Sequence, residues 1–331
     1  MGAVSDRQGR AILNRRGSLI AVVISAAAFG TLAVLTPLAY AAGAEPLPLL
    51  TWRFVIAALL LAGVVASRAP RDLVVSRGDF ARYSALALTG YGAASICFFF
   101  ALKFADASVV AVLLYAYPAF VTVAGWVFFG EKATALKALA VVVTFTGCAL
   151  VVGLLGGPVK VSTPGVLLGL GAAVCYTMFN LLSSRWLPGR SQLVMMGYTF
   201  GIASIGAAAA GAGWAFFASR STSLGFAGRV TAAVASLSPA GWSATVWALL
   251  AAIVIVPTFI AVVLYLQGIR GLGASQAALV STLEPLFTMA LAWALLGERL
   301  APIQFAGAAL VLVGVVLAEV AARRVDRPAA V

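Results

Sequence analysis

The sequence contains no histidine, so the side chain that most often acts as a general base or a metal ligand is missing. It contains only three cysteines, Cys97, Cys148 and Cys175, and each stands alone inside an apolar stretch. This spacing fits neither a disulfide framework nor a zinc cluster, so we expect three unpaired thiols that fill the protein core. We expect no metal site and no cofactor.

Charge is also scarce, at 10% of the residues, whereas apolar residues make up 63%. An average soluble domain is about a quarter charged and about half apolar. A soluble domain could not hide this much apolar surface, so we expect a lipid bilayer to be the solvent for much of the chain. The net charge of +12 would suggest nucleic acid in a soluble protein. Here the positive residues lie between apolar runs, as in membrane proteins, and we expect no nucleic-acid partner.

Ten apolar runs of about 20 residues, the length that a helix needs to cross a bilayer, follow one another along the chain. They cover approximately 18–39, 48–67, 83–102, 108–129, 135–155, 164–184, 192–217, 242–267, 274–296 and 302–321. If the N-terminus is cytoplasmic, sixteen of the 22 basic residues lie on the cytoplasmic side, five lie on the other side, and Arg53 lies inside a span. This bias predicts a multi-pass protein of the cell (inner) membrane with both termini in the cytoplasm.

The first run has a competing interpretation as a cleaved secretory signal. A basic start, an apolar run and the small-residue stretch Ala39-Tyr40-Ala41 follow one another, as in such signals. However, the run is longer than usual for a signal and contains Pro37, and its removal would leave nine spans. We therefore expect it to remain as the first membrane helix.

An internal repeat decides the expected architecture. A shift that carries Ala101 onto Gly268 aligns 101–150 with 268–317 without a gap, and we call this shift the repeat offset. The uncommon residues that match are Pro118 and Pro285, Trp126 and Trp293, Gly130 and Gly297, and Glu131 and Glu298. Each half therefore holds five spans, and because five is odd, the second half enters the membrane from the opposite side. Inverted repeats are typical of secondary transporters, and the alternative is a gene duplication in a membrane protein of another kind.

Three features together resemble a known family: the five-plus-five inverted spans, the mid-span prolines, and Gly-Glu-Lys or Gly-Glu-Arg at the end of spans four and nine. The segment Ser275–Arg299, SQAALVSTLEPLFTMALAWALLGER, and the stretch Trp52-Arg53-Phe54 add to the likeness. On these features the chain resembles the EamA-type branch of the drug/metabolite transporter superfamily. The resemblance implies an exporter of amino acids, other metabolites or toxic compounds. Related branches carry nucleotide sugars and sugar phosphates.

We therefore predict an all-α membrane protein in which ten transmembrane helices form two inverted five-helix repeats around a central cavity. The expected parts are a cytoplasmic N-terminal tail (1–17), a first EamA-like repeat (18–157), a second, inverted EamA-like repeat (164–321) and a cytoplasmic C-terminal tail (322–331).

Pro118 and Pro285 lie near the middle of their spans. Proline removes one backbone hydrogen bond and crowds the carbonyl four residues earlier, here that of Leu114 and of Ser281. We predict a hinge at both prolines, which would widen a central cavity. The alternative is a static kink.

Glu284 precedes Pro285, near the middle of the membrane, where a carboxylate is costly unless it is paired or hydrated. It is a candidate for binding a substrate amine or for carrying a proton, with a structural hydrogen bond as the alternative. Its repeat partner is Tyr117. Arg53 lies about 9 Å inside span two, counted at 1.5 Å per residue. It is a candidate for binding a substrate carboxylate or for pairing with Glu284, and the alternatives are snorkelling to the interface and structural pairing.

Further candidates are aromatic and polar residues within the spans, because transport sites are largely apolar with a few placed polar groups. The predicted substrate-binding set is Glu284, Tyr117, Arg53, Gln276, Tyr91, Tyr176, Asn180 and Trp293. Packing or an interfacial aromatic belt is the alternative for each aromatic residue. We expect Glu131 and Glu298 to have structural roles at helix N-termini instead.

The leading hypothesis is a secondary transporter that exports a small metabolite by alternating access, as a monomer or a homodimer. The chain has no G-x-x-x-x-G-K-[ST] motif, so we do not expect it to hydrolyse ATP. Phosphate recognition calls for several inward-facing basic residues, and Arg53 is alone, so nucleotide sugars or sugar phosphates are the second candidate. A non-transporting sensor or assembly subunit is a third. An intramembrane enzyme would need clustered nucleophiles or bases that the spans lack, and we expect no enzymatic activity.

Overall fold

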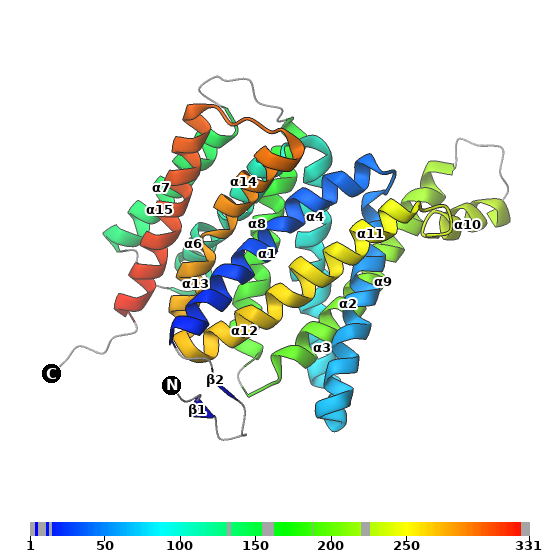
Figure 1. Cartoon of the computed structure of the whole chain (residues 1–331), viewed down its shortest axis with the longest axis horizontal. Helices are drawn as coiled ribbons and strands as arrows, with labels where there is room; N and C mark the ends of the chain where they lie inside the picture. Colours follow the sequence, from blue (N-terminus) through cyan, green and yellow to red (C-terminus); the bar gives the residue numbers. More distant parts are fainter. Residues whose placement is uncertain are drawn as a thin grey trace.

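The fold is taken from a computed structural model, which describes residues 4–5, 11–12, 15–130, 134–153, 162–187, 189–219 and 226–325. Its helices follow the expected spans closely and form one bundle (Figure 1). The elements that make up the ten spans are α1 (Arg15–Ala41), α2 (Pro46–Arg68), α3 (Arg77–Ala85) with η2 (Leu86–Tyr91) and α4 (Gly92–Phe104), α5 (Ala107–Leu114) with α6 (Tyr117–Phe129), α7 (Ala135–Val151), α8 (Thr163–Trp186), α9 (Gln192–Ala218), α11 (Ala244–Ile253) with η4 (Val254–Ile260) and α12 (Ala261–Leu272), α13 (Ala274–Ser281) with α14 (Glu284–Leu296), and α15 (Pro302–Val325).

Within the described residues, nine of these spans are long and apolar enough to cross a bilayer, and α7 adds a shorter apolar helix of 17 residues. The protein is thus an all-α membrane protein of two inverted five-helix repeats, as the sequence predicts. Outside the spans lie η1 (Pro70–Leu73), α10 (Phe226–Ala235) and two paired two-residue strands, β1 (Val4–Ser5) and β2 (Ala11–Ile12).

Spans four and nine are each broken in the middle. In the first half, α5 ends at Leu114 and α6 begins at Tyr117, so that Pro118 lies in the first turn of α6. In the second half, α13 ends at Ser281 and Pro285 lies in the first turn of α14. The first turn of a helix tolerates proline because its N–H groups have no partner within the helix. The structure therefore has a two-residue break at each place where the sequence predicts a hinge.

The structural repeat keeps the repeat offset and extends further than the sequence alignment. This offset carries the first residues of α5, α6 and α7 onto the first residues of α13, α14 and α15. Gly130 and Gly297 end α6 and α14 with left-handed φ angles of 64° and 69°. The π-helical segments η2 and η4 also correspond, so that Tyr91 matches Thr258 at the same offset. Spans three and eight are therefore equivalent, although few identical residues show it.

Glycines let helices of the two halves approach closely. Helices α7 and α15 lie side by side at one edge of the bundle (Figure 1). A Cβ atom on Gly147 would lie 2.6 Å from the carbonyl oxygen of Gly307, and one on Gly307 would lie 2.7 Å from that of Gly147. Close approach at small residues is the usual way in which membrane helices associate.

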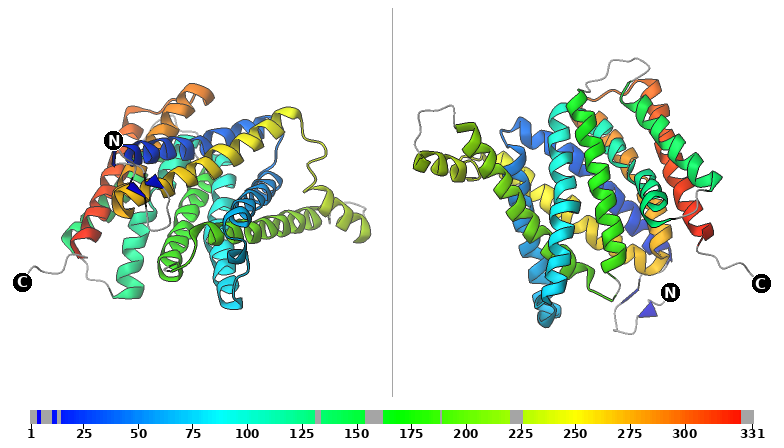
Figure 2. Two further views of the ribbon diagram at one scale, coloured as in Figure 1. Left: turned by 60° about the horizontal axis from the view of Figure 1, so that its bottom comes forward. Right: turned by 180° about the vertical axis from the view of Figure 1, so that it is seen from behind.

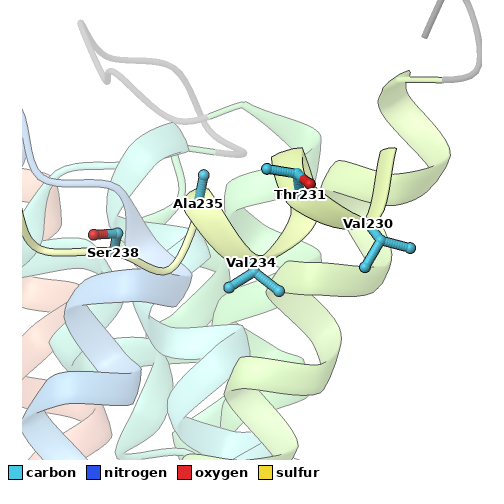
Figure 3. A pocket seen from close by; sticks show the side chains of 5 residues that line it. All are labelled: Val230, Thr231, Val234, Ala235 and Ser238. Carbon is cyan, nitrogen blue, oxygen red and sulfur yellow. The ribbon is translucent and has the colours of Figure 1, made fainter. Parts of the chain in front are cut away.

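Helix α10 lies beside the C-terminal part of α9 and projects from the bundle (Figure 2). It is a short helix in the connection between spans seven and eight. An open hollow of about 480 Å³ lies here, lined by Val230, Thr231, Val234 and Ala235 of α10 and by Ser238 beyond its end. Figure 3 shows these five side chains. None of these side chains is charged, and the hollow lies apart from the candidate site below.

Candidate functional site

Arg53 is fully enclosed by the protein, with 1% of its surface exposed. Its Nε donates to Thr258 Oγ1 at 3.1 Å, and its Nη2 donates to Tyr91 Oη at 3.3 Å. Its guanidinium carbon also lies 5.4 Å and 5.5 Å from the ring centroids of Phe54 and Phe99. The alternative of snorkelling to the interface is therefore wrong, because the side chain remains inside the bundle.

Arg53 has no carboxylate partner within 4 Å in the described part of the chain. Its charge is stabilised by two hydroxyls and two aromatic faces, which leave guanidinium N–H groups without a partner among the described residues. A buried cation without a carboxylate is costly. Arg53 therefore offers both charge and hydrogen-bond donors to an anionic group.

The two hydroxyls that bind Arg53 lie at equivalent positions of the two halves. Tyr91 ends η2, and Thr258 lies inside η4. The hydroxyl of Thr258 also donates to the carbonyl of Ile253 at 2.9 Å. Single π-helical turns often occur at functional sites. Arg53 thus joins the third and the eighth span through one side chain.

Glu284 lies at the break between α13 and α14 and faces the break of the other half. Tyr115, between α5 and α6, places its hydroxyl oxygen 2.8 Å from Glu284 Oε2 and 2.9 Å from the carbonyl oxygen of Ser281. Ser281 is the residue whose carbonyl Pro285 leaves without its helical partner. Tyr115, which is 8% exposed, therefore joins the two breaks through one hydroxyl group.

A row of aromatic rings connects the acidic and the basic end of the site. The ring of Tyr115 lies 6.3 Å from that of Tyr117, which lies 5.0 Å from that of Tyr176. Tyr176 stacks on Phe179 at 5.8 Å, and Phe179 contacts Tyr91 at 5.5 Å. We call these five residues the aromatic row. It runs from Glu284 to Arg53 through spans four, six and three.

The structure thus brings five of the predicted site residues together along the aromatic row: Glu284, Tyr117, Tyr176, Tyr91 and Arg53. Asn180 lies one turn beyond Tyr176, to whose carbonyl its amide donates at 2.8 Å.

The other two predicted site residues lie outside the row. Gln276 is exposed in the first turn of α13. Trp293 is 67% exposed and nine residues after Glu284, about half a turn away around α14 at 3.6 residues per turn.

Three residues of the site are absent from the predicted set: Tyr115, Thr258 and Phe179. Tyr115 and Glu284 meet across the two halves, so their contact depends on how the breaks face each other. A signal for Thr258 was present, because the repeat offset carries Tyr91 onto it. The alignment began only at Ala101, beyond that pair.

Glu298 has a structural role, but at a different helix from the one that its position suggests. Its carboxylate accepts from Ala107 N, Ser108 N and Ser108 Oγ at 2.7, 3.0 and 2.7 Å. It thus caps the N-terminus of α5 in the other half instead of the helix that follows it. Glu131, its repeat partner, lies outside the described residues.

The cysteines fit their expected role as core filler: Cys148 is buried, Cys97 and Cys175 are half-buried, and all three are free thiols. No group of three or more Cys, Asp or Glu side chains that could hold a metal ion occurs within the described ranges.

Two inverted five-helix halves, with broken helices that meet at Glu284, are features typical of secondary transporters. The sequence model of the EamA-like transporter family matches residues 16–153 and 163–319, and the chain belongs to that family. It is therefore a membrane transporter of the drug/metabolite type, whose substrates are small molecules.

Among solved structures, a protein whose title reads only "Crystal structure of protein" is 19% identical, with a TM-score of 0.58. The similarity covers 95% of this chain and 100% of that chain, and it shows a shared fold. No curated protein matches the chain.

Proposed function

We propose that the protein exports small metabolites that carry both a positive and a negative group, such as amino acids or related compounds, across the cell (inner) membrane. The observation that supports this proposal is the aromatic row with one carboxyl group, Glu284, at one end and one buried guanidinium, Arg53, at the other. A substrate ammonium group would face Glu284, and a substrate carboxylate would face Arg53. A compound whose two charged groups lie far apart could reach both ends, whereas an α-amino acid would reach one end at a time. Both termini would lie in the cytoplasm.

The rings between these ends contact one another, so a substrate can enter only if they separate. The two helix breaks are the natural places for that movement, because the helical ladder is interrupted there and the break residues Thr282 and Leu283 are held only by turn hydrogen bonds to Leu279 and Val280. We propose that Pro118 and Pro285 mark the two hinges. The repeats 18–157 and 164–321 would then tilt against each other and open the row to one side at a time, as a monomer or a homodimer.

Arg53 also argues against a phosphate-bearing substrate. A phosphate group calls for several donors, and in the described site only one basic side chain reaches the row. Nucleotide sugars and sugar phosphates therefore remain the second candidate.

The test is counterflow in liposomes that contain only the purified protein. Thermal-shift screening against amino acids, cationic drugs and sugar phosphates would first identify a ligand. Exchange of that ligand between the two sides should then be lost in Arg53→Gln and should lose its proton dependence in Glu284→Gln. The control is Glu45→Gln, which changes a 67% exposed carboxylate that pairs with Lys103 at the surface. It should exchange ligand at the wild-type rate.

Three outcomes would reject parts of the proposal. Ligand binding without any flux would favour the sensor alternative. Stabilisation by sugar phosphates alone would favour the second substrate class. Counterflow in Glu284→Gln with the pH dependence of the wild type would exclude Glu284 from proton coupling.

A further inference from the structure

We propose that Tyr115 is a positioning residue that couples the protonation of Glu284 to the closure of the second helix break. The three atoms concerned are Tyr115 Oη, the carbonyl oxygen of Ser281 and Glu284 Oε2, and we call them the Tyr115 latch. The inference rests on the proposed transport function, and it identifies which movement the proton would control.

The argument begins with the number of protons. A tyrosine hydroxyl has one proton to donate, and two oxygens lie within hydrogen-bond distance of Tyr115 Oη. A carbonyl can only accept. Both contacts are therefore full hydrogen bonds only if Glu284 carries a proton and donates it to Tyr115 Oη, while Tyr115 donates to Ser281.

Loss of the proton from Glu284 changes this arrangement. An ionised carboxylate is the stronger acceptor, because charge-assisted hydrogen bonds are about twice as strong as neutral ones. The hydroxyl proton of Tyr115 then turns to Glu284, and the carbonyl of Ser281 loses its donor. Because Pro285 has no N–H to offer, this carbonyl must find water, and the break between α13 and α14 loosens.

Among the residues that the structure describes, no basic side chain pairs with Glu284 to replace the proton. The titratable groups that interact electrostatically with Tyr115 or Glu284 are Tyr117 of α6, Tyr176 of α8 and Tyr265 of α12. Glu319 of α15 interacts electrostatically with Tyr117 and Tyr265. Helix α1, which packs against α14, contributes the carbonyl of Gly30, to which Thr288 Oγ1 donates at 3.2 Å. In the described part of the chain, Tyr115 is thus the one side chain with a hydrogen bond to Glu284.

Hydrogen exchange of the purified protein tests the latch without any substrate. Mass spectrometry measures the exchange rates of the backbone amides from Thr282 to Thr288 over a range of pH. In wild type, exchange there should speed up as Glu284 ionises, by about tenfold, the effect of losing one hydrogen bond. All rates are divided by those of the same residues in the unfolded chain, which removes the intrinsic pH dependence of exchange. Tyr40→Phe removes another hydroxyl-to-carbonyl bond, from Tyr40 to Phe99, and leaves the latch intact, so as the matched control it should keep the wild-type pH profile.

Two variants should fix the latch in opposite states. In Tyr115→Phe the Ser281 carbonyl has no donor at any pH, so exchange should be fast throughout. In Glu284→Gln the side-chain amide donates to Tyr115 Oη at every pH, so exchange should stay slow and lose its pH dependence. A purely structural hydroxyl would change the rate and leave the pH profile unaltered.

The latch is wrong if wild type and Glu284→Gln keep a constant ratio of exchange rates over the whole pH range, a comparison that stands even if Tyr115→Phe fails to fold. It is also wrong if folded Tyr115→Phe follows the wild-type profile. Counterflow separates this failure from that of the proposed function. Substrate flux together with pH-independent hydrogen exchange would support transport and contradict the latch. Hydrogen exchange that depends on pH, without substrate flux, would support the latch and contradict transport.

Discussion

At the scale of single residues, Arg53 shows how a charge can be buried without a carboxylate. Thr258 accepts one of its N–H groups at 3.1 Å, and this hydroxyl is itself buried. Thr258→Val keeps the shape of the side chain and leaves the Nε–H of Arg53 without an acceptor. We expect the free energy of unfolding to fall by about 1–3 kcal/mol, and thermal unfolding in detergent would measure it.

The matched control for this variant is Thr36→Val. Thr36 is also fully buried, but its hydroxyl donates only to the carbonyl of Leu32 in its own helix. No buried donor loses its acceptor there, so the free energy of unfolding should change by less than about 1 kcal/mol. An equal fall in the free energy of unfolding in both variants would show that the hydrogen bond between Thr258 and Arg53 does not stabilise the protein more than an ordinary intrahelical one.

At the scale of helices, the contact between α7 and α15 depends on glycine. The Cβ atom of Gly147→Ala would lie 2.6 Å from Gly307 O and 2.7 Å from Val311 N, and these backbone atoms cannot rotate away. We expect a loss of about 1–3 kcal/mol from overpacking, seen as a lower unfolding temperature. Gly63→Ala in α2 is the control, because a Cβ atom there would have no neighbouring atom within 4 Å. An unchanged unfolding temperature of Gly147→Ala would mean that the two helices separate easily.

The positions of the helices are the part of the structure that the sequence predicts best. Long apolar runs, the two prolines and the repeat follow from composition and spacing, so all ten spans could be placed within a few residues. The π-helical segments η2 and η4 could not, because one extra residue in a turn leaves no trace in an apolar run. The contact between Tyr115 and Glu284 joins residues 169 positions apart at the two helix breaks, and only the tertiary structure brings them together. Burial of Arg53 likewise depends on the hydroxyls and rings that surround it.

At the scale of the whole molecule, Glu298 ties the second repeat to the first. Its carboxylate accepts three hydrogen bonds from Ala107 and Ser108 at the N-terminus of α5, where negative charge is favoured. In Glu298→Gln the charge is lost and an NH₂ group faces these donors, so we expect a loss of about 1–2 kcal/mol. Urea titration would measure it, beside Glu45→Gln, whose exposed ion pair should contribute under about 1 kcal/mol. Equal losses in both variants would contradict a cap that joins the two repeats.

The inverted arrangement of the two repeats makes the sharpest prediction for the molecule as a whole. Lys103 and Arg270 are both exposed, and the repeat offset makes them equivalent positions. Two parallel repeats would place them on the same side of the membrane, whereas two inverted repeats must place them on opposite sides. Single cysteines, Lys103→Cys and Arg270→Cys, would be introduced after Cys97, Cys148 and Cys175 have been replaced by alanine.

A membrane-impermeant maleimide added to intact cells should label Lys103→Cys, and it should label Arg270→Cys only after permeabilisation. This outcome also places the end of α12 in the cytoplasm, as the distribution of basic residues predicts. The reverse pattern would keep the inversion and turn the whole protein over in the membrane. Labelling of both variants from one side would contradict the inverted fold itself, because a residue at the end of α4 and its equivalent at the end of α12 can share a face only if the repeats run the same way.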